Sequence, residues 1–253
     1  MPEAISWKFL DVGEVDSTQR VADGMAQLGA AQGLVVLATE QVMGRGRLDR
    51  EWLSPRGGLY MSLVLRPARK TEVRLLPLVG AFAIVEGIAE STGIVSLVRW
   101  PNDVTIAGRK AAGVIAESRY RGTDLSYVVL GIGINCNLDP ASLGALAGYS
   151  TSLSDQLGAT VDLDAVRDAT LESFEGLYSL WEGGSEGVIF ADRAALFSTV
   201  GRRVEIELLD GGVEINCRAE RVTEDGSLVV TRDDDDGSRL VVRGEEIRRL
   251  REI

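Results

Sequence analysis

The chain has 253 residues, of which 45% are hydrophobic and 26% are charged, a composition typical of globular proteins. It contains no histidine, which excludes a Ser-His-Asp triad, a Cys-His pair and a histidine-ligated zinc site. The formal net charge is −11, which argues against a general nucleic-acid binder. No apolar run approaches the roughly 18 residues of a membrane-spanning helix, and the N-terminal sequence lacks the pattern of a secretory signal. We therefore expect a cytoplasmic enzyme or binding protein.

The first four-fifths of the chain mixes helical and strand patterns. The predicted helices cover 14–30, 71–92, 162–182 and 186–198. In the first of them, Asp16, Ser17 or Thr18 can provide the N-cap. The predicted strands are 33–38, 59–65, 95–100 and 125–134, with a hairpin formed by 103–107 and 110–117.

From Gly201 onward the pattern changes to short alternating strands. The predicted strands are 203–209, 213–222, 227–231, 239–243 and 245–250, with Asp-Gly turns at 210–211 and 225–226. The aspartate-rich loop 233–238 is expected to solvate a turn rather than to bind a metal. We therefore expect an α+β fold with a main domain over 1–199 and a small β-barrel over 200–253.

Cysteine and lysine are both rare in this chain. Cys136 and Cys217 form no CxxC motif, so we expect two reduced thiols in the core rather than a disulfide or a metal site. The only lysines are Lys8, Lys70 and Lys110, because arginine supplies almost every other cation. Lys110 stands out among them because it lies in a segment that is otherwise expected to be buried.

A basic segment follows the strand 33–38. Residues 39–70 contain seven basic and three acidic residues, a net charge of +4 within an acidic chain. In the sequence QVMGRGR, which runs from Gln41 to Arg47, Gly44 and Gly46 allow close approach of the backbone to a ligand. Arg45 and Arg47 can both reach one anion, because guanidinium groups pair well with carboxylate and phosphate oxygens. The motif is neither a Walker loop nor a dinucleotide fingerprint, and a solvated surface loop is the alternative.

A second motif, RWPND, ends the strand 95–100. Pro101 gives the chain a rigid exit that projects Asn102 and Asp103 from the sheet. Lys110 begins the next strand, and the small residues after it, including Gly113, leave room for a ligand beside its ammonium group. The alternative is a Trp-Pro packing corner followed by a capped turn.

Two further segments could contact a ligand. The sequence GIGINCN ends the strand 125–134, where Gly131 and Gly133 provide a flat floor for a planar group or mark a bulge. Trp52 could form a wall over an apolar ligand or cover the core. The remaining polar candidates are Ser17, Thr18 and Gln19, which could bond a ligand or simply cap the helix.

Together, the segments DSTQ, EQVMGRGRLDREWLSPRGG, RWPNDV with GRKAAGVIAE, and GIGINCN resemble the biotin–protein ligases, also called biotin–acetyl-CoA-carboxylase ligases. The resemblance runs from about residue 11 to the C-terminus. It implies an α+β catalytic domain, shared with lipoate ligases and class II tRNA synthetases, and an SH3-like barrel after it. It also implies two reactions. Biotin and ATP give biotinyl-5′-AMP and diphosphate, and a lysine of a biotin carboxyl carrier domain then takes the biotin and releases AMP.

The resemblance also assigns roles to individual residues. The expected catalytic residues are Lys110, Arg47, Arg45 and Asp103. The expected biotin-binding residues are Ser17, Thr18, Gln19, Gln41, Gly44, Arg45, Gly46, Arg47, Trp52, Lys110 and Gly113. The expected nucleotide-binding residues are Arg47, Asn102, Lys110, Gly131, Gly133 and Asn135. Asp103 is also the candidate ligand for Mg²⁺, and no tightly bound prosthetic group is expected.

Three positions depart from the family's pattern. Gln19 replaces the usual asparagine, and Arg99 replaces the usual lysine. Asp49 replaces the usual glycine of the arginine loop, the glycine- and arginine-rich segment 39–51. Two alternatives remain: a lipoate- or octanoate-type protein ligase, and a biotin or adenylate sensor without transfer activity. Because few residues precede the catalytic segment and the chain is acidic, we expect neither a DNA-binding domain nor specific DNA binding. The resemblance leaves a monomer and a weak homodimer both open.

Overall fold

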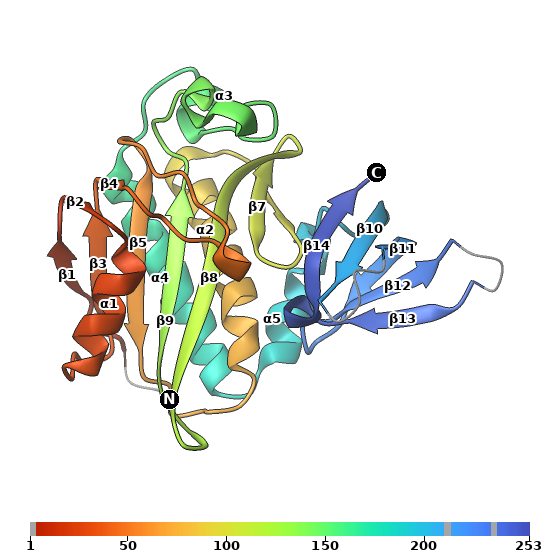
Figure 1. Cartoon of the computed structure of the whole chain (residues 1–253), viewed down its shortest axis with the longest axis horizontal. Helices are drawn as coiled ribbons and strands as arrows, with labels where there is room; N and C mark the ends of the chain where they lie inside the picture. The colour runs from red at the N-terminus through yellow and green to blue at the C-terminus, as the bar shows by residue number, and fades with distance from the viewer. Residues whose placement is uncertain (1–3, 210–213, 234–236) are drawn as a thin grey trace.

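The computed structural model of the protein describes residues 4–209, 214–233 and 237–253. Two sheets organise this part of the chain: a mixed seven-stranded sheet and a five-stranded antiparallel sheet formed by the C-terminal residues (Figure 1). Helices accompany the first sheet, so the structure confirms the predicted α+β class. Within the described ranges, no helix combines the length and the apolar character that crossing a membrane requires.

The main sheet brings distant parts of the chain side by side. Its strands, in spatial order, are β1 (Lys8–Asp11), β3 (Leu34–Ala38), β5 (Leu59–Leu65), β9 (Asp124–Ile134), β8 (Arg109–Arg121), β7 (Asp103–Ile106) and β6 (Leu97–Arg99). β1 runs parallel to β3, and every other neighbouring pair is antiparallel. β2 (Glu14–Val15) and β4 (Glu40–Gln41) form a separate short parallel pair that joins the start of the first helix to the arginine loop.

Helices cover both faces of the main sheet. Alternate strand residues face different layers, so that Val35 joins the large core whereas Val36 packs in a second, smaller core. α2 (Leu76–Thr92) and α4 (Leu163–Glu182) lie on the large-core face, and α1 (Thr18–Gln27) covers the other (Figure 1). α2 is apolar on nearly all sides because it is enclosed between the sheet and α4. The shorter helices are α3 (Leu153–Leu157) and α5 (Glu186–Asp192).

Most predicted elements are confirmed, with differences at their ends. α1 begins at Thr18, and Ser17 occupies the N-cap position without a side-chain capping bond. α2 is preceded by a 3-10 turn at Val73–Leu75, so the helix predicted from residue 71 begins at Leu76. The helix predicted over 186–198 ends at Asp192. The sequence patterns did not indicate β1 or α3, both of which are short.

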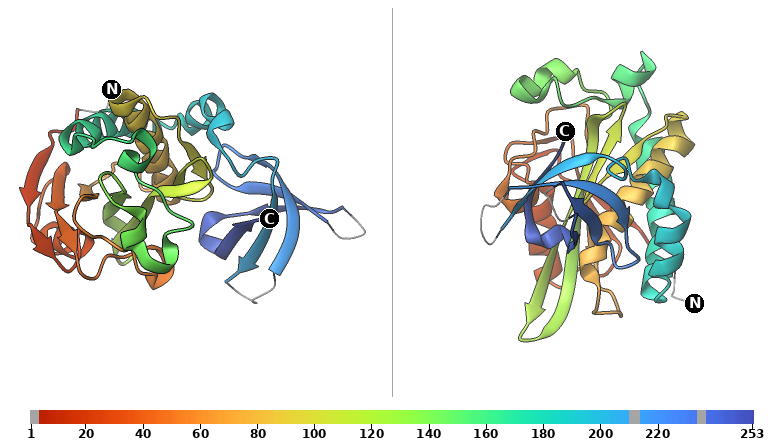
Figure 2. Two further views of the ribbon diagram at one scale, coloured as in Figure 1. Left: turned by 90° about the horizontal axis from the view of Figure 1, so that it is seen from above. Right: turned by 90° about the vertical axis from the view of Figure 1, so that its right-hand side faces the viewer.

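The C-terminal sheet lies beside the β6 edge of the main sheet, as the two further views show (Figure 2). Its strands, in spatial order, are β13 (Arg239–Val242), β12 (Leu228–Arg232), β11 (Glu214–Val222), β10 (Arg203–Leu208) and β14 (Ile247–Glu252). The predicted turn at 225–226 is present, with Gly226 at a φ of +74°. The predicted turn at 210–211 and the centre of the aspartate-rich loop 233–238 lie outside the described residues.

The two cysteines are buried, and neither forms a disulfide within the described residues, as predicted. Burial raises the pKa of the Cys136 thiol to about 12 and that of the Cys217 thiol to about 11. Because the thiolate is the reactive form, we expect neither cysteine to be alkylated in the native protein at pH 8. Mass spectrometry after iodoacetamide treatment tests this expectation, with the urea-unfolded chain as the control that takes two labels. Rapid labelling of the native chain would contradict it.

Candidate functional site

A cavity of about 180 Å³ opens between the two sheets. It is bordered by the start of α1, the arginine loop, β8 and β9, the turn after β6, and the first residues of β14. It brings together most of the residues that the sequence marks as candidates. Those that line it are Ser17, Thr18, Gln19, Gln41, Arg45, Gly46, Arg47, Trp52, Asn102, Asp103, Lys110, Gly113, Gly131 and Gly133.

Glycines on β8 and β9 form a flat wall of this cavity, and Trp52 lies against it. A Cβ atom on Gly133 would be 2.7 Å from the Trp52 ring, and one on Gly113 would be 3.2 Å from it. The planar group that lies on the predicted glycine floor is therefore the indole of Trp52 itself. Trp52 separates the glycine-lined wall from the arginine loop and gives the cavity an apolar side.

One end of the cavity is a network of hydrogen-bonded polar side chains. The Thr18 backbone N–H donates to Gln41 Oε1 at 2.8 Å, and the Thr18 hydroxyl lies 2.8 Å from the Ser62 hydroxyl. Ser62 in turn donates to Gln19 Oε1 at 3.0 Å, while Gln19 Nε2 donates to the Val129 carbonyl at 2.9 Å. Gln19 therefore uses both ends of its amide within the protein. Sequence reasoning missed Ser62, although a single serine within the apolar strand LYMSLVL is a recognisable signal.

Two buried polar atoms at this cavity are unpaired. Ser17 Oγ and Trp52 Nε1 make no hydrogen bond to any of the described residues. An unsatisfied buried donor costs about 1–3 kcal/mol, which a ligand that bonds to it would recover. Among the described residues, these two atoms indicate that the cavity is built for a small molecule with polar groups.

The opposite end of the cavity carries cations. Lys110 Nζ lies 2.6 Å from Asp103 Oδ1 and 5.0 Å from the centre of the Trp52 ring. Lys110 is the second residue of β8, which pairs with β7, and Asp103 is the first residue of β7. The pair is partly exposed, with 30% of the Lys110 side chain accessible, so a ligand anion can reach the ammonium group.

Arg47 reaches across to the C-terminal sheet. Its guanidinium donates to Asn102 Oδ1 at 3.3 Å, to the Gly244 carbonyl, and to the Ile247 carbonyl at 3.4 Å. Burial lowers the pKa of Arg47, but an arginine stays charged at neutral pH. Sequence reasoning expected Arg47 at the ligand and did not foresee that backbone carbonyls near β14 would hold it.

Arg45 is paired with two carboxylates. Its guanidinium lies 3.0 Å from Asp49 Oδ1 and 3.5 Å from Glu117 Oε1. Asp49 and Leu48 both adopt left-handed backbone angles, with φ near +56° and +55°. This conformation suits the glycine that the resemblance expects at residue 49, so the aspartate is held in a backbone conformation that side chains rarely adopt.

Two predicted site residues do not line the cavity. Asn135 is buried and its Nδ2 donates to the Thr151 carbonyl at 3.0 Å, which ties the end of β9 to the segment before α3. Gly44 packs beneath the loop, where a Cβ atom would be 2.3 Å from the Trp52 carbonyl oxygen. Both residues shape the site from behind rather than from within the cavity.

A second cavity, of about 510 Å³, adjoins the first. It extends from Arg45 and Arg47 toward the start of α2 and the C-terminal sheet, and Asn102 lies on the boundary of both cavities. In the part of the chain that the structure describes, no group of three acidic or cysteine side chains could hold a metal ion. The predicted metal ligand, Asp103, is instead paired with Lys110. The arrangement suits a ligand with a polar ring, an apolar middle and an anionic end next to a second anionic molecule.

Comparison with known proteins gives consistent matches. Residues 12–135 match the biotin/lipoate A/B protein ligase family. The chain is 31% identical to a biotin–[acetyl-CoA-carboxylase] ligase of Paracoccus denitrificans, with 87% of this chain and 92% of that protein covered. It is 36% identical to a bifunctional ligase/repressor of Bacillus subtilis over 69% of this chain, and it spans 58% of that relative's length. A biotin protein ligase from Aquifex aeolicus, solved with biotin and ATP, superposes with a TM-score of 0.83 at 26% identity, covering 97% of this chain and 99% of that one.

Proposed function

The chain belongs to the biotin/lipoate A/B protein ligase family, and on that premise we propose that it is an ATP-dependent biotin–protein ligase. It activates biotin as biotinyl-5′-AMP and transfers the biotin to a lysine of a biotin carboxyl carrier domain. One observation carries the proposal: the unpaired buried Ser17 hydroxyl and the partly exposed Lys110 ammonium group line one cavity. Biotin has the complementary chemistry, with a ureido ring at one end and a carboxylate at the other.

The polar end of the cavity binds the ureido ring. The ureido group offers one carbonyl acceptor and two N–H donors, and Ser17 Oγ is the free hydroxyl available to that carbonyl. Thr18 and Gln41 present further oxygen and nitrogen atoms beside it. The sulfur-containing ring and the aliphatic chain pack along Trp52, toward Lys110.

The first reaction brings a carboxylate to the α-phosphate of ATP. Two unit charges 4 Å apart interact by about 4 kcal/mol at an effective dielectric constant of about 20, so the approach of two anions needs cations between them. Lys110, in the first cavity, and Arg47, at the boundary of the two cavities, supply that charge. Their stabilisation increases as negative charge develops on the phosphate oxygens, which lowers the barrier.

The nucleotide extends from Lys110 into the second cavity. Arg47 and Asn102 lie at the junction of the two cavities and are the nucleotide contacts that we propose. Gly131 and Gly133 contribute indirectly, as parts of the glycine wall on which Trp52 packs. Asn135 holds the end of β9 in place. Gly46 lines the cavity, and its lack of a side chain allows the backbone of the arginine loop to approach the ligand closely.

Magnesium fits this site as an ion that binds together with ATP, rather than as one that the protein holds permanently. Mg²⁺ is commonly held by one or two carboxylates together with substrate phosphates and water. Asp103 is the carboxylate at the cavity that would contact it, since only one of its oxygens is paired with Lys110. When bound, the ion neutralises part of the charge on the phosphates.

The second reaction requires a lysine amine on the carrier to reach the acyl carbon of the adenylate. Asp103, beside Lys110, is placed to accept the proton that this amine loses, and AMP leaves as the other product. We propose that residues 1–199 form the catalytic domain, that 200–253 form the barrel, and that the reaction takes place in the cytoplasm.

Biotin-dependent exchange of labelled diphosphate into ATP tests the proposal without any carrier. We expect exchange when biotin is present and none with lipoate or octanoate in its place. Exchange with lipoate alone would assign the chain to the lipoate branch of the family. Tight biotin binding without exchange would favour a sensor.

Replacing Asp49 with glycine should tighten biotin binding. The change removes the carboxylate that pairs with Arg45 and places a glycine at a left-handed backbone position. A largely exposed ion pair contributes about 0.2–1 kcal/mol, so we expect affinity to rise by about two- to fivefold, most clearly at low salt. Calorimetric titration measures it. Asp49→Asn removes the charge but keeps a side chain at the left-handed position, so it separates these two effects. Unchanged biotin affinity in both variants would show that Asp49 does not compete with biotin for Arg45.

A further inference from the structure

The C-terminal sheet forms part of the proposed active site, so its position relative to the main sheet affects the site. The first residues of β14, from Ile247 to Leu250, line the smaller cavity. Carbonyls of Gly244 and Ile247 hold the Arg47 guanidinium, and the Arg248 carbonyl accepts from Arg50 at 2.9 Å. Any shift of this sheet therefore moves Arg47.

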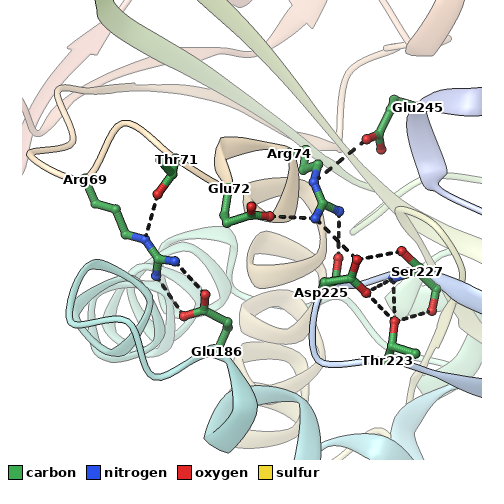
Figure 3. Close-up of polar contacts among 9 residues, drawn as sticks. All are labelled: Arg69, Thr71, Glu72, Arg74, Glu186, Thr223, Asp225, Ser227 and Glu245. Atoms are coloured by element: carbon green, nitrogen blue, oxygen red, sulfur yellow. Dashed lines mark hydrogen bonds and ion pairs between the residues drawn. The ribbon is translucent and has the colours of Figure 1, made fainter.

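Arg74 connects the start of α2 to two turns of the C-terminal sheet (Figure 3). Its Nη1 donates to the Asp225 carbonyl at 2.7 Å, and its Nη2 lies 3.5 Å from the Asp225 carboxylate. Nη2 also lies 2.6 Å from Glu72, and Nε lies 3.9 Å from Glu245. One guanidinium thus sits among three carboxylates, which would repel each other without it.

The first of these turns is a rigid docking point. Asp225 accepts hydrogen bonds from the Thr223 hydroxyl and, at 3.0 Å, from the Ser227 hydroxyl (Figure 3). Gly226 has a φ of +74° and packs so tightly on the 3-10 turn before α2 that a Cβ atom would be 2.6 Å from Leu75. The indole of Trp100 donates to the Gly226 carbonyl at 2.9 Å. The tryptophan of the RWPND motif therefore docks the C-terminal sheet, whereas Asn102 and Asp103 of the same motif line the cavity.

The second turn leads directly to Arg47. Glu245 follows Gly244, whose carbonyl accepts from Arg47 and whose Cα packs close to Pro101. Arg74 therefore holds the docking turn through Asp225 and the carbonyl-bearing turn through Glu245. Arg74 borders the second cavity, but its Nη1 and Nη2 atoms are paired with Asp225 and Glu72, which favours a role in holding these turns over direct contact with the nucleotide.

We propose that Arg74 is a positioning residue for nucleotide binding: it fixes the C-terminal sheet so that Arg47 lies at the junction of the two cavities. The inference rests on the proposed function, because it assumes that Arg47 contacts the nucleotide. Arg74 and its partners are not among the described residues that line the first cavity, so biotin affinity should not depend on this contact.

Arg74→Gln tests the inference against Arg69→Gln as the matched control. Arg69 also precedes α2, but it pairs with Glu186 of α5 through two hydrogen bonds of 2.7 and 2.6 Å (Figure 3). Its hydrogen-bond partners in the part of the chain that the structure describes all lie outside the C-terminal sheet. We expect Arg74→Gln to weaken ATP binding and raise the KM for ATP by about fivefold or more, with the Kd for biotin within about twofold. Arg69→Gln should lower Tm and leave both constants unchanged.

Asp225→Ala separates positioning from direct contact. This change removes a carboxylate that pairs with Arg74 and leaves every cation in place, so a direct phosphate contact by Arg74 predicts unchanged or tighter ATP binding. If Arg74 acts by positioning, Asp225→Ala should lose as much ATP affinity as Arg74→Gln. Arg74→Lys should keep part of the affinity that Arg74→Gln loses. Unchanged ATP affinity in Arg74→Gln, or an equal loss in Arg69→Gln, would overturn the inference.

The two proposals fail in distinguishable ways. Calorimetric titration of wild type with biotin and with ATP measures binding independently of catalytic activity. If wild type binds neither, the proposed function fails. If wild type binds both and the Arg74 and Asp225 variants bind ATP equally well, only the positioning role fails. Should Arg74→Gln not fold, the comparison of Arg74→Lys with Asp225→Ala decides the question by the same criteria.

Discussion

Replacing Lys110 with alanine should lower the rate of biotin adenylation by about a thousandfold. Lys110 Nζ is the cation at the junction of the biotin carboxylate and the α-phosphate, and Trp52 on one side and Asp103 on the other hold it in place. Its removal also leaves the Asp103 carboxylate unpaired beside two anions, which adds repulsion to the lost attraction. Release of diphosphate, followed with biotin and ATP at saturation, measures the effect.

Lys70→Ala is the matched control for this variant. Lys70 pairs at the surface with Asp124 at 3.6 Å and does not line the cavity. We expect it to react like wild type. Lys110→Arg keeps the charge but spreads it over a planar group, so we expect an intermediate rate. Adenylation by Lys110→Ala within about tenfold of wild type would remove Lys110 from the proposed chemistry.

Replacing Gly133 with alanine should weaken biotin binding by about tenfold or more. The new Cβ atom would lie 2.7 Å from two atoms of the Trp52 ring, so the indole must leave the glycine wall. Trp52 would then enter the space proposed for the apolar part of biotin and lose its place beside Lys110. Calorimetry measures affinity, and tryptophan fluorescence reports the displacement.

Gly24→Ala is the control for adding a methyl group. Gly24 lies within α1, where a Cβ atom would meet nothing within 4 Å, and alanine favours a helix. We expect this variant to bind biotin like wild type and to be slightly more stable. If Gly133→Ala also binds biotin with wild-type affinity, Trp52 does not form a wall of the biotin site.

Hydrophobic periodicity predicted the long elements of the fold and missed the short ones. α2 and α4 have long apolar patterns, and β5 and β9 have strand-like runs, so their existence was clear. β1 has only four residues and lies at the edge of the sheet with most of its side chains exposed, which leaves no alternating pattern to detect. Residue 71 lies in the predicted helix but outside α2, because a 3-10 turn comes first.

The candidate site was predictable where motifs mark it and hidden where tertiary contacts complete it. Composition and motif spacing led to Arg47 and Lys110, which the structure places at one cavity. Nothing in the sequence near Arg47 indicates that carbonyls about two hundred residues later, at Gly244 and Ile247, would hold it. Pairing between segments this far apart leaves no local periodic signal. The left-handed backbone at Asp49 explains why glycine is expected there, which the residue type alone could not show.

Transfer of biotin to a carrier tests the central proposal most directly. Purified protein would be mixed with ATP, magnesium, biotin and a biotin carboxyl carrier domain, and the mass of the carrier would then be measured. We predict a gain of one biotin per carrier with wild type and with Lys70→Ala, and almost none with Lys110→Ala in the same time. An unchanged carrier mass with wild type, under conditions where biotin and ATP both bind, would contradict the assignment of a biotin–protein ligase.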